Sequence, residues 1–352
     1  MNKESYRVRP PSSHMIEKVS EAGLGEVEPA PLPDLLREAD RGRFAVAPAS
    51  IPAKGWRDVF WRVAYNVIDD RVLPLAGGVA YYALLAVFPA VAMTVSLYGL
   101  FADASTVSRH LVLLSDILPP GSADLLAQQM TRIAGQSANT LGIAFLTSLL
   151  ISLWSANAGM SALFDAINVI YKEKEKRSLW RFYATTLLFT LAAVVFLVVA
   201  IAAIVVVPVV LNLFGWGGYS ERLLALLRWP GLFFVIVVGL TIVYRYGPSR
   251  RPAKWRWITS GSAIAASAWI AASMLFSWYV SNFDSYNRMY GSLGAVVGFQ
   301  IWLWLSSVIV LLGAEFNAET EHQTAIDSTE GAPKPLGRRG ATMADTIGKA
   351  QT

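Results

Sequence analysis

Two carboxylates near the end of the chain are spaced so that they could share a proton or a cation. Glu315 and Glu319 are four residues apart, and Asn317 lies between them. Side chains four apart lie on one face of a helix, and paired carboxylates can receive a proton or a cation. At a water interface, however, carboxylates are commonly solvated or paired with nearby lysine and arginine. Glu315 and Asn317 are therefore candidate residues of a transport path, with the solvated alternative left open.

A second polar group lies between two apolar runs, in SNFDSYNRMYGSLG at 281–294. Asp284 and Arg288 are four apart and could pair with each other on a continued helical turn, and Gly291 could supply a turn. We interpret the segment first as a rigid outer hairpin and alternatively as the external gate of a transport path. The candidate gate residues are Asn282, Asp284, Tyr286, Tyr290 and Gly291.

Two amides, Asn157 and Asn168, lie in or just beyond an apolar run. Polar groups inside a bilayer are costly and tend to mark a path or a packing contact. Amides also make hydrogen bonds between membrane helices, worth about 0.6–2 kcal/mol each. Both asparagines are candidates for the path, and interhelical packing is the alternative.

Other kinds of chemistry find little support in the sequence. The chain has no cysteine, and its histidines, His14, His110 and His322, lie far apart. Metal-dependent nucleases need clustered histidines and carboxylates, and neither a HExxH motif nor a phosphate-binding Walker loop is present. We therefore expect no metal, no cofactor, no nucleic-acid partner and no enzymatic activity.

The elements that must position these residues are membrane helices. The composition is 54% hydrophobic and only 16% charged, and the apolar residues come in blocks of roughly 18 or more, enough to cross a bilayer core about 30 Å thick. The sequence therefore predicts an all-α polytopic membrane protein with six transmembrane helices. The predicted spans are about 76–101, 140–160, 182–211, 229–246, 258–280 and 292–314.

The charges of the connections predict the orientation, because lysine and arginine are retained on the cytoplasmic side. The connections after the second and fourth spans contain the most lysine and arginine. The connection after the second span carries Lys172, Lys174, Lys176, Arg177 and Arg181, and the connection after the fourth carries Arg245, Arg250, Arg251, Lys254 and Arg256. Both termini are then cytoplasmic. The polar, proline-rich segments 1–55 and 321–352 are predicted to be disordered tails, with one short helix around 34–39.

The segment 56–74 is amphipathic. It could lie along the inner leaflet with Arg57, Arg62 and Arg71 near lipid phosphates. The alternative is a helix packed under the membrane domain.

Three stretches resemble one family. They are AYYALLAVFPAVAMTVSLYGLF, LWSANAGMSALFDAINVIYKEKEKRSLWRF, and the run from IVYRYGPSRRPAKWRWITSGSAIAASAWI through FSWYVSNFDSYNRMYGSLGAVVGFQIWLWLSSVIVLLGAEFNAE. In order, spacing and polar punctuation they are similar to the YihY/virulence factor BrkB family of bacterial inner-membrane proteins, over about residues 55 to 320. In the first stretch, the typical Tyr–aliphatic–Phe–Pro order adds Tyr82 and Pro89 to the candidate path residues.

The resemblance implies a six-helix protein of the inner membrane. Family members have been linked to virulence and serum resistance, and some to export of lipid or lipopolysaccharide precursors; an old ribonuclease BN label is regarded as a misassignment. We therefore expect a transporter or flippase-like exporter of a lipid, lipid precursor or other amphiphile, with membrane lipids as partners. The alternative is a membrane scaffold or envelope-integrity factor that binds anionic lipid or a partner protein.

Overall fold

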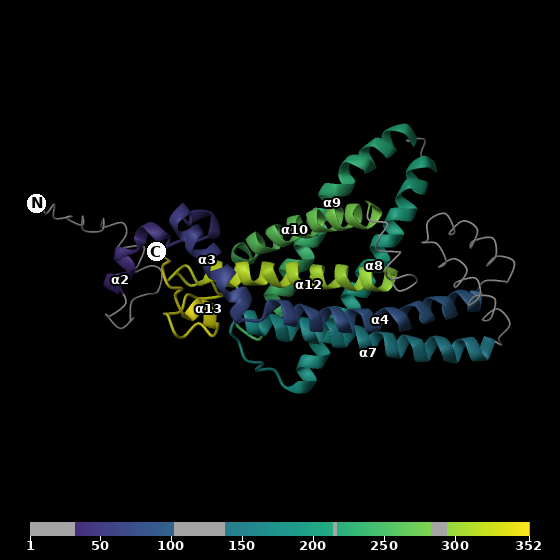
Figure 1. Ribbon diagram of the computed structural model, residues 1–352, viewed down its shortest axis with the longest axis horizontal. Helices are drawn as coiled ribbons and strands as arrows, with labels where there is room; N and C mark the ends of the chain where they lie inside the picture. Colours follow the sequence, from purple (N-terminus) through teal and green to yellow (C-terminus); the bar gives the residue numbers. More distant parts are fainter. Residues whose placement is uncertain (1–31, 102–137, 214–216, 283–293, 352) are drawn as a thin grey trace, which may run out of the picture.

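The computed structural model describes residues 32–101, 138–213, 217–282 and 294–351, and it is dominated by long helices (Figure 1). These helices are α4 (Val72–Phe101), α7 (Ala138–Ile170), α8 (Leu179–Leu213), α9 (Gly217–Tyr246), α10 (Trp255–Asn282) and α12 (Gly294–Glu321). Each covers one predicted span almost entirely. In lipid a helix is favoured because it satisfies all backbone hydrogen bonds within one segment.

Five stretches of the described helices are long and apolar enough to cross a membrane. They are Val72–Ala90, Gly142–Ile170, Leu179–Phe196, Trp255–Val280 and Val296–Glu321. Helix α9 adds a shorter apolar segment, Pro230–Tyr246, at the place of the predicted fourth span. The predicted class, an all-α multi-pass membrane protein, is confirmed. The count of six spans and the cytoplasmic placement of both termini stay predictions.

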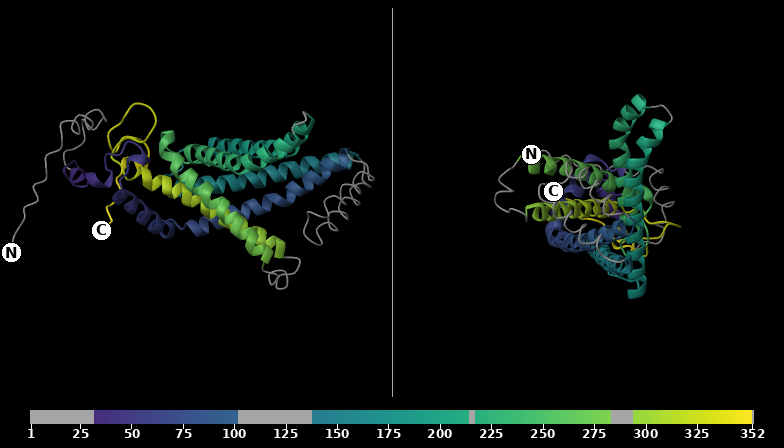
Figure 2. Two further views of the ribbon diagram at one scale, coloured as in Figure 1. Left: turned by 90° about the horizontal axis from the view of Figure 1, so that it is seen from above. Right: turned by 90° about the vertical axis from the view of Figure 1, so that its right-hand side faces the viewer.

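Helix α4 packs along α7, and α12 packs against both α4 and α10 (Figures 1 and 2). Helices α8 and α9 pack on each other and run obliquely to α4, α7 and α12 in Figure 1. Large apolar side chains such as Trp154, Leu188 and Phe234 are exposed. This is the surface expected of helices whose solvent is lipid.

Helices α10 and α12 approach closely at two glycines. A Cβ atom added to Gly261 would lie 2.5 Å from Asn317 Oδ1, and one added to Gly313 would lie 2.6 Å from the Cβ of Ala265 on α10. Small residues let membrane helices approach at their backbones. Gly261 on α10 and Gly313 on α12 therefore mark a close crossing of the two helices.

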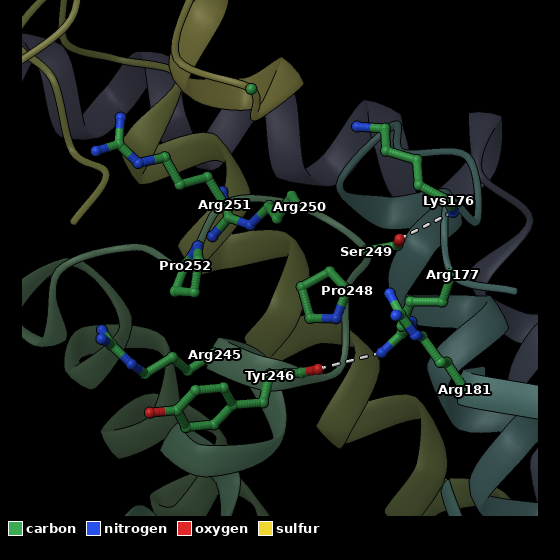
Figure 3. A pocket seen from close by; sticks show the side chains of 11 residues that line it. Lys176, Arg177, Arg181, Arg245, Tyr246, Pro248, Ser249, Arg250, Arg251 and Pro252 are labelled. Atoms are coloured by element: carbon green, nitrogen blue, oxygen red, sulfur yellow. Dashed lines mark hydrogen bonds between the residues drawn. The ribbon is translucent and has the colours of Figure 1, made fainter. Parts of the chain in front are cut away.

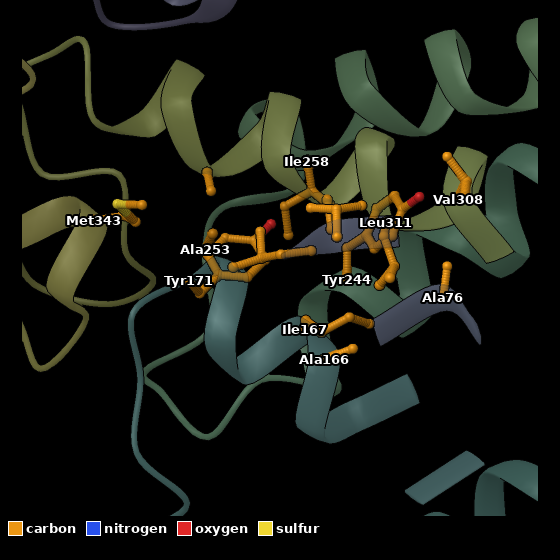
Figure 4. Close-up of a cluster of buried hydrophobic side chains, with 14 residues drawn as sticks. Ala76, Ala166, Ile167, Tyr171, Tyr244, Ala253, Ile258, Val308, Leu311 and Met343 are labelled. Carbon is orange, nitrogen blue, oxygen red and sulfur yellow. The ribbon is translucent and has the colours of Figure 1, made fainter. Parts of the chain in front are cut away.

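One end of the bundle carries most of the buried polar groups, and we call it the polar end. It comprises α3 (Ala53–Asp69), the connections 171–178 and 247–254, the last turns of α12, and residues 322–351. A hydrophobic cluster joins these parts (Figure 4). It includes Tyr171, Tyr244, Ile258, Leu311 and, from the C-terminal segment, Met343. Several spans and the end of the chain thus share one core.

Helix α3 packs under the membrane domain, against α12. Its buried residues are Gly55, Asp58, Val59 and Arg62, whereas Phe60, Trp61, Tyr65 and Ile68 are exposed. Arg62 therefore faces the protein, as the packing alternative for 56–74 expects. Arg57 and Arg71 are exposed, and a lipid contact through them stays a prediction. The short helix expected around 34–39 is α2 (Leu32–Arg37).

The prediction of disordered tails is wrong for the described parts of both. Residues 38–52 form two short 3₁₀ helices, Ala39–Arg41 and Pro48–Ser50, that lead into α3. Residues 322–351 pack against the other parts of the polar end and bury Gln323, Asp327 and Arg339. Ala253 and Thr329 form an antiparallel bridge, and α13 (Thr342–Asp345) carries Met343 into the core. Proline and glycine in this segment make turns rather than disorder.

Arg339 holds this C-terminal segment together. Its fully buried side chain donates hydrogen bonds to the carbonyl oxygens of Lys334 (3.1 Å), Ala344 (2.6 Å) and Ala325 (2.5 Å). Hydrogen bonds from charged donors are the strong ones, and an unpaired buried carbonyl is costly. Arg339→Met should therefore destabilise the segment by about 3 kcal/mol and speed its cleavage by thermolysin.

The neighbouring exposed Arg338 offers the matched control, since Arg338→Met removes the same charge one residue away. This variant should be cleaved at the wild-type rate. Equal cleavage of the two variants would contradict the role given to Arg339.

Candidate functional site

The last turns of α12 place two carboxylates against α3. Glu315 and Glu319 lie one helical turn apart, and both are buried. The amide nitrogen of Asn66 on α3 donates to Glu315 Oε1 at 2.9 Å and to Glu319 Oε1 at 2.9 Å. One amide therefore bridges the two carboxylates that the spacing predicted to lie together.

Glu319 also has a cationic partner. Arg62 Nε donates a short hydrogen bond to Glu319 Oε2, and its Nη2 donates to the Glu319 carbonyl (3.1 Å) and to Gln323 Oε1 (2.7 Å). His322 Nδ1 lies 3.4 Å from Glu319 Oε1. The charge of Glu319 is thus compensated inside the protein.

A second ion pair lies where α3 meets α4. Asp70, at the C-terminal cap of α3, pairs with Lys172, which follows α7. Burial raises the pKa of Asp70, and the hydrogen bond from Lys172 acts in the opposite direction. Arg71 and Lys172 have left-handed φ angles of 53° and 54°, a backbone conformation that residues other than glycine seldom adopt. Both ends of this pair are therefore set by tight turns.

Glu315 has no cationic partner among the described residues. Its Oε2 atom is buried and has no hydrogen-bond partner in the described part of the chain. Arg62 pairs with Glu319, and Lys172 with Asp70. We call Asn66, Asp70, Glu315 and Glu319, with Arg62 and Lys172, the carboxylate cluster. Because an ionised carboxylate buried without a partner is costly, Glu315 is suited to bind a proton or a cation.

Asn317 belongs to a different contact. It lies on another face of α12, and its Oδ1 accepts a hydrogen bond from Gly261 N on α10 at 2.8 Å. Its Nδ2 atom is buried without a partner among the described residues. Although the sequence grouped Asn317 with Glu315, the helix separates them, and Asn317 lies at the α10–α12 crossing.

Asn168 ties two connections together. Its Nδ2 donates to Glu175 Oε2 at 3.0 Å, and its Oδ1 accepts from Ser249 N at 2.7 Å. Burial acts to raise the pKa of Glu175, but hydrogen bonds from Arg177 and Asn168 outweigh it and lower that pKa to about 2. The packing alternative left open for Asn168 fits these contacts.

The other candidates among the described residues do not belong to the carboxylate cluster. Tyr82 and Pro89 are on α4, where the Tyr82 ring meets Tyr81 edge-on at 5.5 Å. Asn157 lies within α7, and its Oδ1 is buried without a partner among the described residues. Asn282 is the last residue of α10. Asp284, Tyr286, Tyr290 and Gly291 lie outside the described residues, as do His14 and His110.

Sequence reasoning did not assign Asn66, Asp70 and Arg62 to a site. A signal for them was present, because Asp58, Arg62, Asn66 and Asp70 are spaced four residues apart along 56–74. Polar residues at that spacing form one stripe of a helix, and in the structure this stripe faces the protein. Asp58 accepts hydrogen bonds from Arg41 at 2.8 Å and from Gln351 N at 3.0 Å. Among the described residues, no group of histidine and carboxylate side chains has the geometry to hold a metal ion.

The chain is similar to several bacterial proteins. It is 30% identical over 247 residues to the ribonuclease-like protein YfkH of Bacillus subtilis, covering 68% of this chain and 86% of that protein. It is 26% identical over 278 residues to a UPF0761 membrane protein of Pseudoalteromonas translucida, covering 77% and 89%. A UPF0761 membrane protein of Alkalilimnicola ehrlichii is 31% identical over 256 residues, which are 72% of this chain and 56% of that longer protein.

No solved structure matches the chain significantly. The family model described as virulence factor BrkB matches residues 63–336. That range holds the described membrane helices and most of the carboxylate cluster, and it ends inside the C-terminal segment. The protein is therefore a multi-pass bacterial membrane protein that belongs to the virulence factor BrkB family.

Proposed function

We propose that this protein is a transporter or flippase-like exporter of a lipid, lipid precursor or other amphiphile, and that proton binding at Glu315 drives it. The observation that carries the proposal is the buried carboxyl group of Glu315, one oxygen of which has no hydrogen-bond partner among the described residues. Ionisable groups buried in membrane helices tend to belong to substrate paths or proton relays. The proposal includes no catalytic step, cofactor or nucleic acid.

The surroundings of Glu315 support a proton as the coupling ion. The charged groups that interact electrostatically with Glu315 are Glu319, Asp70 and Lys172. Asp70 and Lys172 already pair with each other. Protonation of Glu315 would remove its repulsion with the two neighbouring carboxylates. Loss of that proton would restore the repulsion at the contact between α3 and α12. A change of this kind at a helix contact can shift the balance between two arrangements.

The test is lipid movement in vesicles under an imposed proton gradient. Full-length protein is reconstituted with a trace of fluorescently labelled phospholipid, and the label reaching the opposite leaflet is measured by its loss of protection from a membrane-impermeant quencher. The wild-type rate should rise with the gradient. Glu315→Gln, which keeps the hydrogen bond from Asn66 but cannot ionise, should remove the gradient-dependent part of the rate.

Asp40→Asn is the matched control, because Asp40 is an exposed carboxylate on the short 3₁₀ helix that leads into α3. Its rate should follow the wild type. A wild-type protein that moves no labelled phospholipid with or without a gradient would contradict transport of phospholipids and favour the scaffold alternative. Loss of gradient dependence in the control as well would remove the special role of Glu315.

A further inference from the structure

A basic groove of about 400 Å³ opens at the polar end (Figure 3). Six cationic residues line it, Lys176, Arg177, Arg181, Arg245, Arg250 and Arg251, and its lining contains no carboxylate. The connections 171–178 and 247–254 supply most of them. Its volume is within the range of small-molecule sites, about 300–1,000 Å³.

Four of the six cations already have a carboxylate partner outside the lining. Lys176 pairs with Glu173, Arg177 with Glu175, Arg245 with Glu330, and Arg250 with Glu321. These pairs fix the walls of the groove. In Figure 3, Arg177 and Arg181 lie on one side of Pro248, and Arg245 and Arg251 lie on the other.

Arg181 and Arg251 have no carboxylate partner in the described part of the chain. The Nη1 atom of Arg251 is buried without any hydrogen-bond partner among the described residues. Gly331, at φ 92°, packs against the same guanidinium, where an added Cβ would lie 2.6 Å from Nη2. The groove therefore keeps an excess of positive charge, which an anion with several acceptor oxygens would compensate.

The position of the groove indicates the source of such an anion. The groove lies where α9 ends, at Tyr246, and where α8 and α10 begin, at Leu179 and Trp255. Trp180, Tyr246 and Trp255 are exposed, and exposed tryptophan and tyrosine at helix ends are typical of the headgroup level of a membrane. Basic pockets between membrane helices on the cytoplasmic side suit anionic headgroups.

We propose that this groove binds the phosphate of an anionic phospholipid headgroup, attracted by the two lining arginines that have no carboxylate partner among the described residues, Arg181 and Arg251. The shared chemistry is a phosphate group, and the location at the ends of three membrane helices favours the lipid over free phosphate. The site does not require that the protein transports anything.

The test is binding to the purified full-length chain in a nonionic detergent, where no charged membrane surface attracts lipid nonspecifically. Phosphatidylglycerol, phosphatidylcholine and inorganic phosphate are titrated separately, and bound molecules are counted by native mass spectrometry. One phosphatidylglycerol should bind tightly, and phosphatidylcholine and inorganic phosphate should bind much more weakly. Arg181→Gln/Arg251→Gln should weaken phosphatidylglycerol binding at least about tenfold for each guanidinium removed.

Lys174→Gln/Arg256→Gln is the matched control, because both residues are exposed in or next to the same two connections, yet do not line the groove. This variant should bind as the wild type does. Thermal unfolding verifies that both variants are folded, and Arg181→Lys/Arg251→Lys, which keeps the charge but loses the planar fork, should bind with intermediate affinity.

Three outcomes would overturn the proposal. The first is equal binding of phosphatidylglycerol and phosphatidylcholine, and the second is an equal loss in the groove and control variants. The third is inorganic phosphate binding as tightly as phosphatidylglycerol, which would assign the groove to a free anion. Lipid binding is measured in detergent and transport in vesicles. A negative binding result therefore does not contradict the proposed transport, and a negative transport result does not contradict lipid binding.

Discussion

Arg250→Met should lower the stability of the protein by about 3–5 kcal/mol, because it breaks an ion pair that is sealed from solvent. Arg250 donates to both carboxylate oxygens of Glu321, at 3.0 Å and 2.6 Å, and both side chains are fully buried. The guanidinium also lies 4.1 Å from the ring centre of Tyr171. Burial acts against the charged guanidinium, but Glu321 outweighs it and raises the pKa of Arg250 above its ordinary value.

The variant would leave Glu321 buried with the hydroxyl of Ser328, at 2.9 Å, as its remaining hydrogen-bond donor among the described residues. Unfolding in detergent, followed by circular dichroism, should show a clearly lower midpoint. Arg250→Met/Glu321→Met should recover most of the loss, because replacing both partners of a buried pair is often neutral or stabilising. Lys54→Met breaks the exposed pair with Asp40 and should change the midpoint little.

A double variant as unstable as Arg250→Met alone would contradict this account. The loss would then come from packing around the Arg250 side chain and not from the charge left behind on Glu321.

Gly261→Ala should destabilise the contact between α10 and α12 by about 1–3 kcal/mol or more. Alanine favours a helix over glycine by up to about 1 kcal/mol, so any loss measures the crowding directly. The new methyl group would meet the Gly313 carbonyl oxygen and Asn317 Oδ1. Since the first of these is backbone, the helices must move apart, and the hydrogen bond from Gly261 N to Asn317 at 2.8 Å must lengthen.

The matched control is Gly239→Ala on α9, where an added Cβ would meet no atom within 4 Å. That variant should be as stable as the wild type or slightly more stable. Unfolding midpoints of the two variants, measured in the same detergent, decide between crowding and a general effect of removing glycine. Equal midpoints would mean that α10 and α12 can separate at little cost.

Long apolar runs made the membrane helices predictable, because a bilayer tolerates few alternatives to a helix. The i,i+4 spacing of Glu315 and Glu319 likewise predicted that they share a face. For the segment 56–74 the sequence left two alternatives open, a lipid contact through Arg57, Arg62 and Arg71 or a helix packed under the membrane domain. The partner of Arg62 is Glu319, 257 residues away, and the local pattern of a helix does not identify a partner so distant in the chain.

The order of the C-terminal segment could not be predicted from its composition. The stretch APKPLGRRG has the proline and glycine of a flexible tail, yet turns built around single side chains hold it. Asp327 accepts hydrogen bonds from Thr329 N at 2.8 Å and from Lys334 N at 2.8 Å. Adjacent arginines also differ completely in burial, since Arg339 is buried and Arg338 exposed. Tertiary packing, rather than local preference, makes that distinction.

The contacts between α3 and residues 349–351 have a consequence for biosynthesis. Arg62 donates to the carbonyl of Lys349 at 3.1 Å, and Asp58 accepts from Gln351 N at 3.0 Å. Chains fold from the N-terminus as they are synthesised, so α3 leaves the ribosome long before residues 349–351 exist. The membrane helices are then inserted while Asp58 and Arg62 still lack these partners, and the polar end is completed only after residues 349–351 have left the ribosome. A ribosome stalled before that point should hold a protein whose helices are in the membrane but whose α3 is still open to proteases.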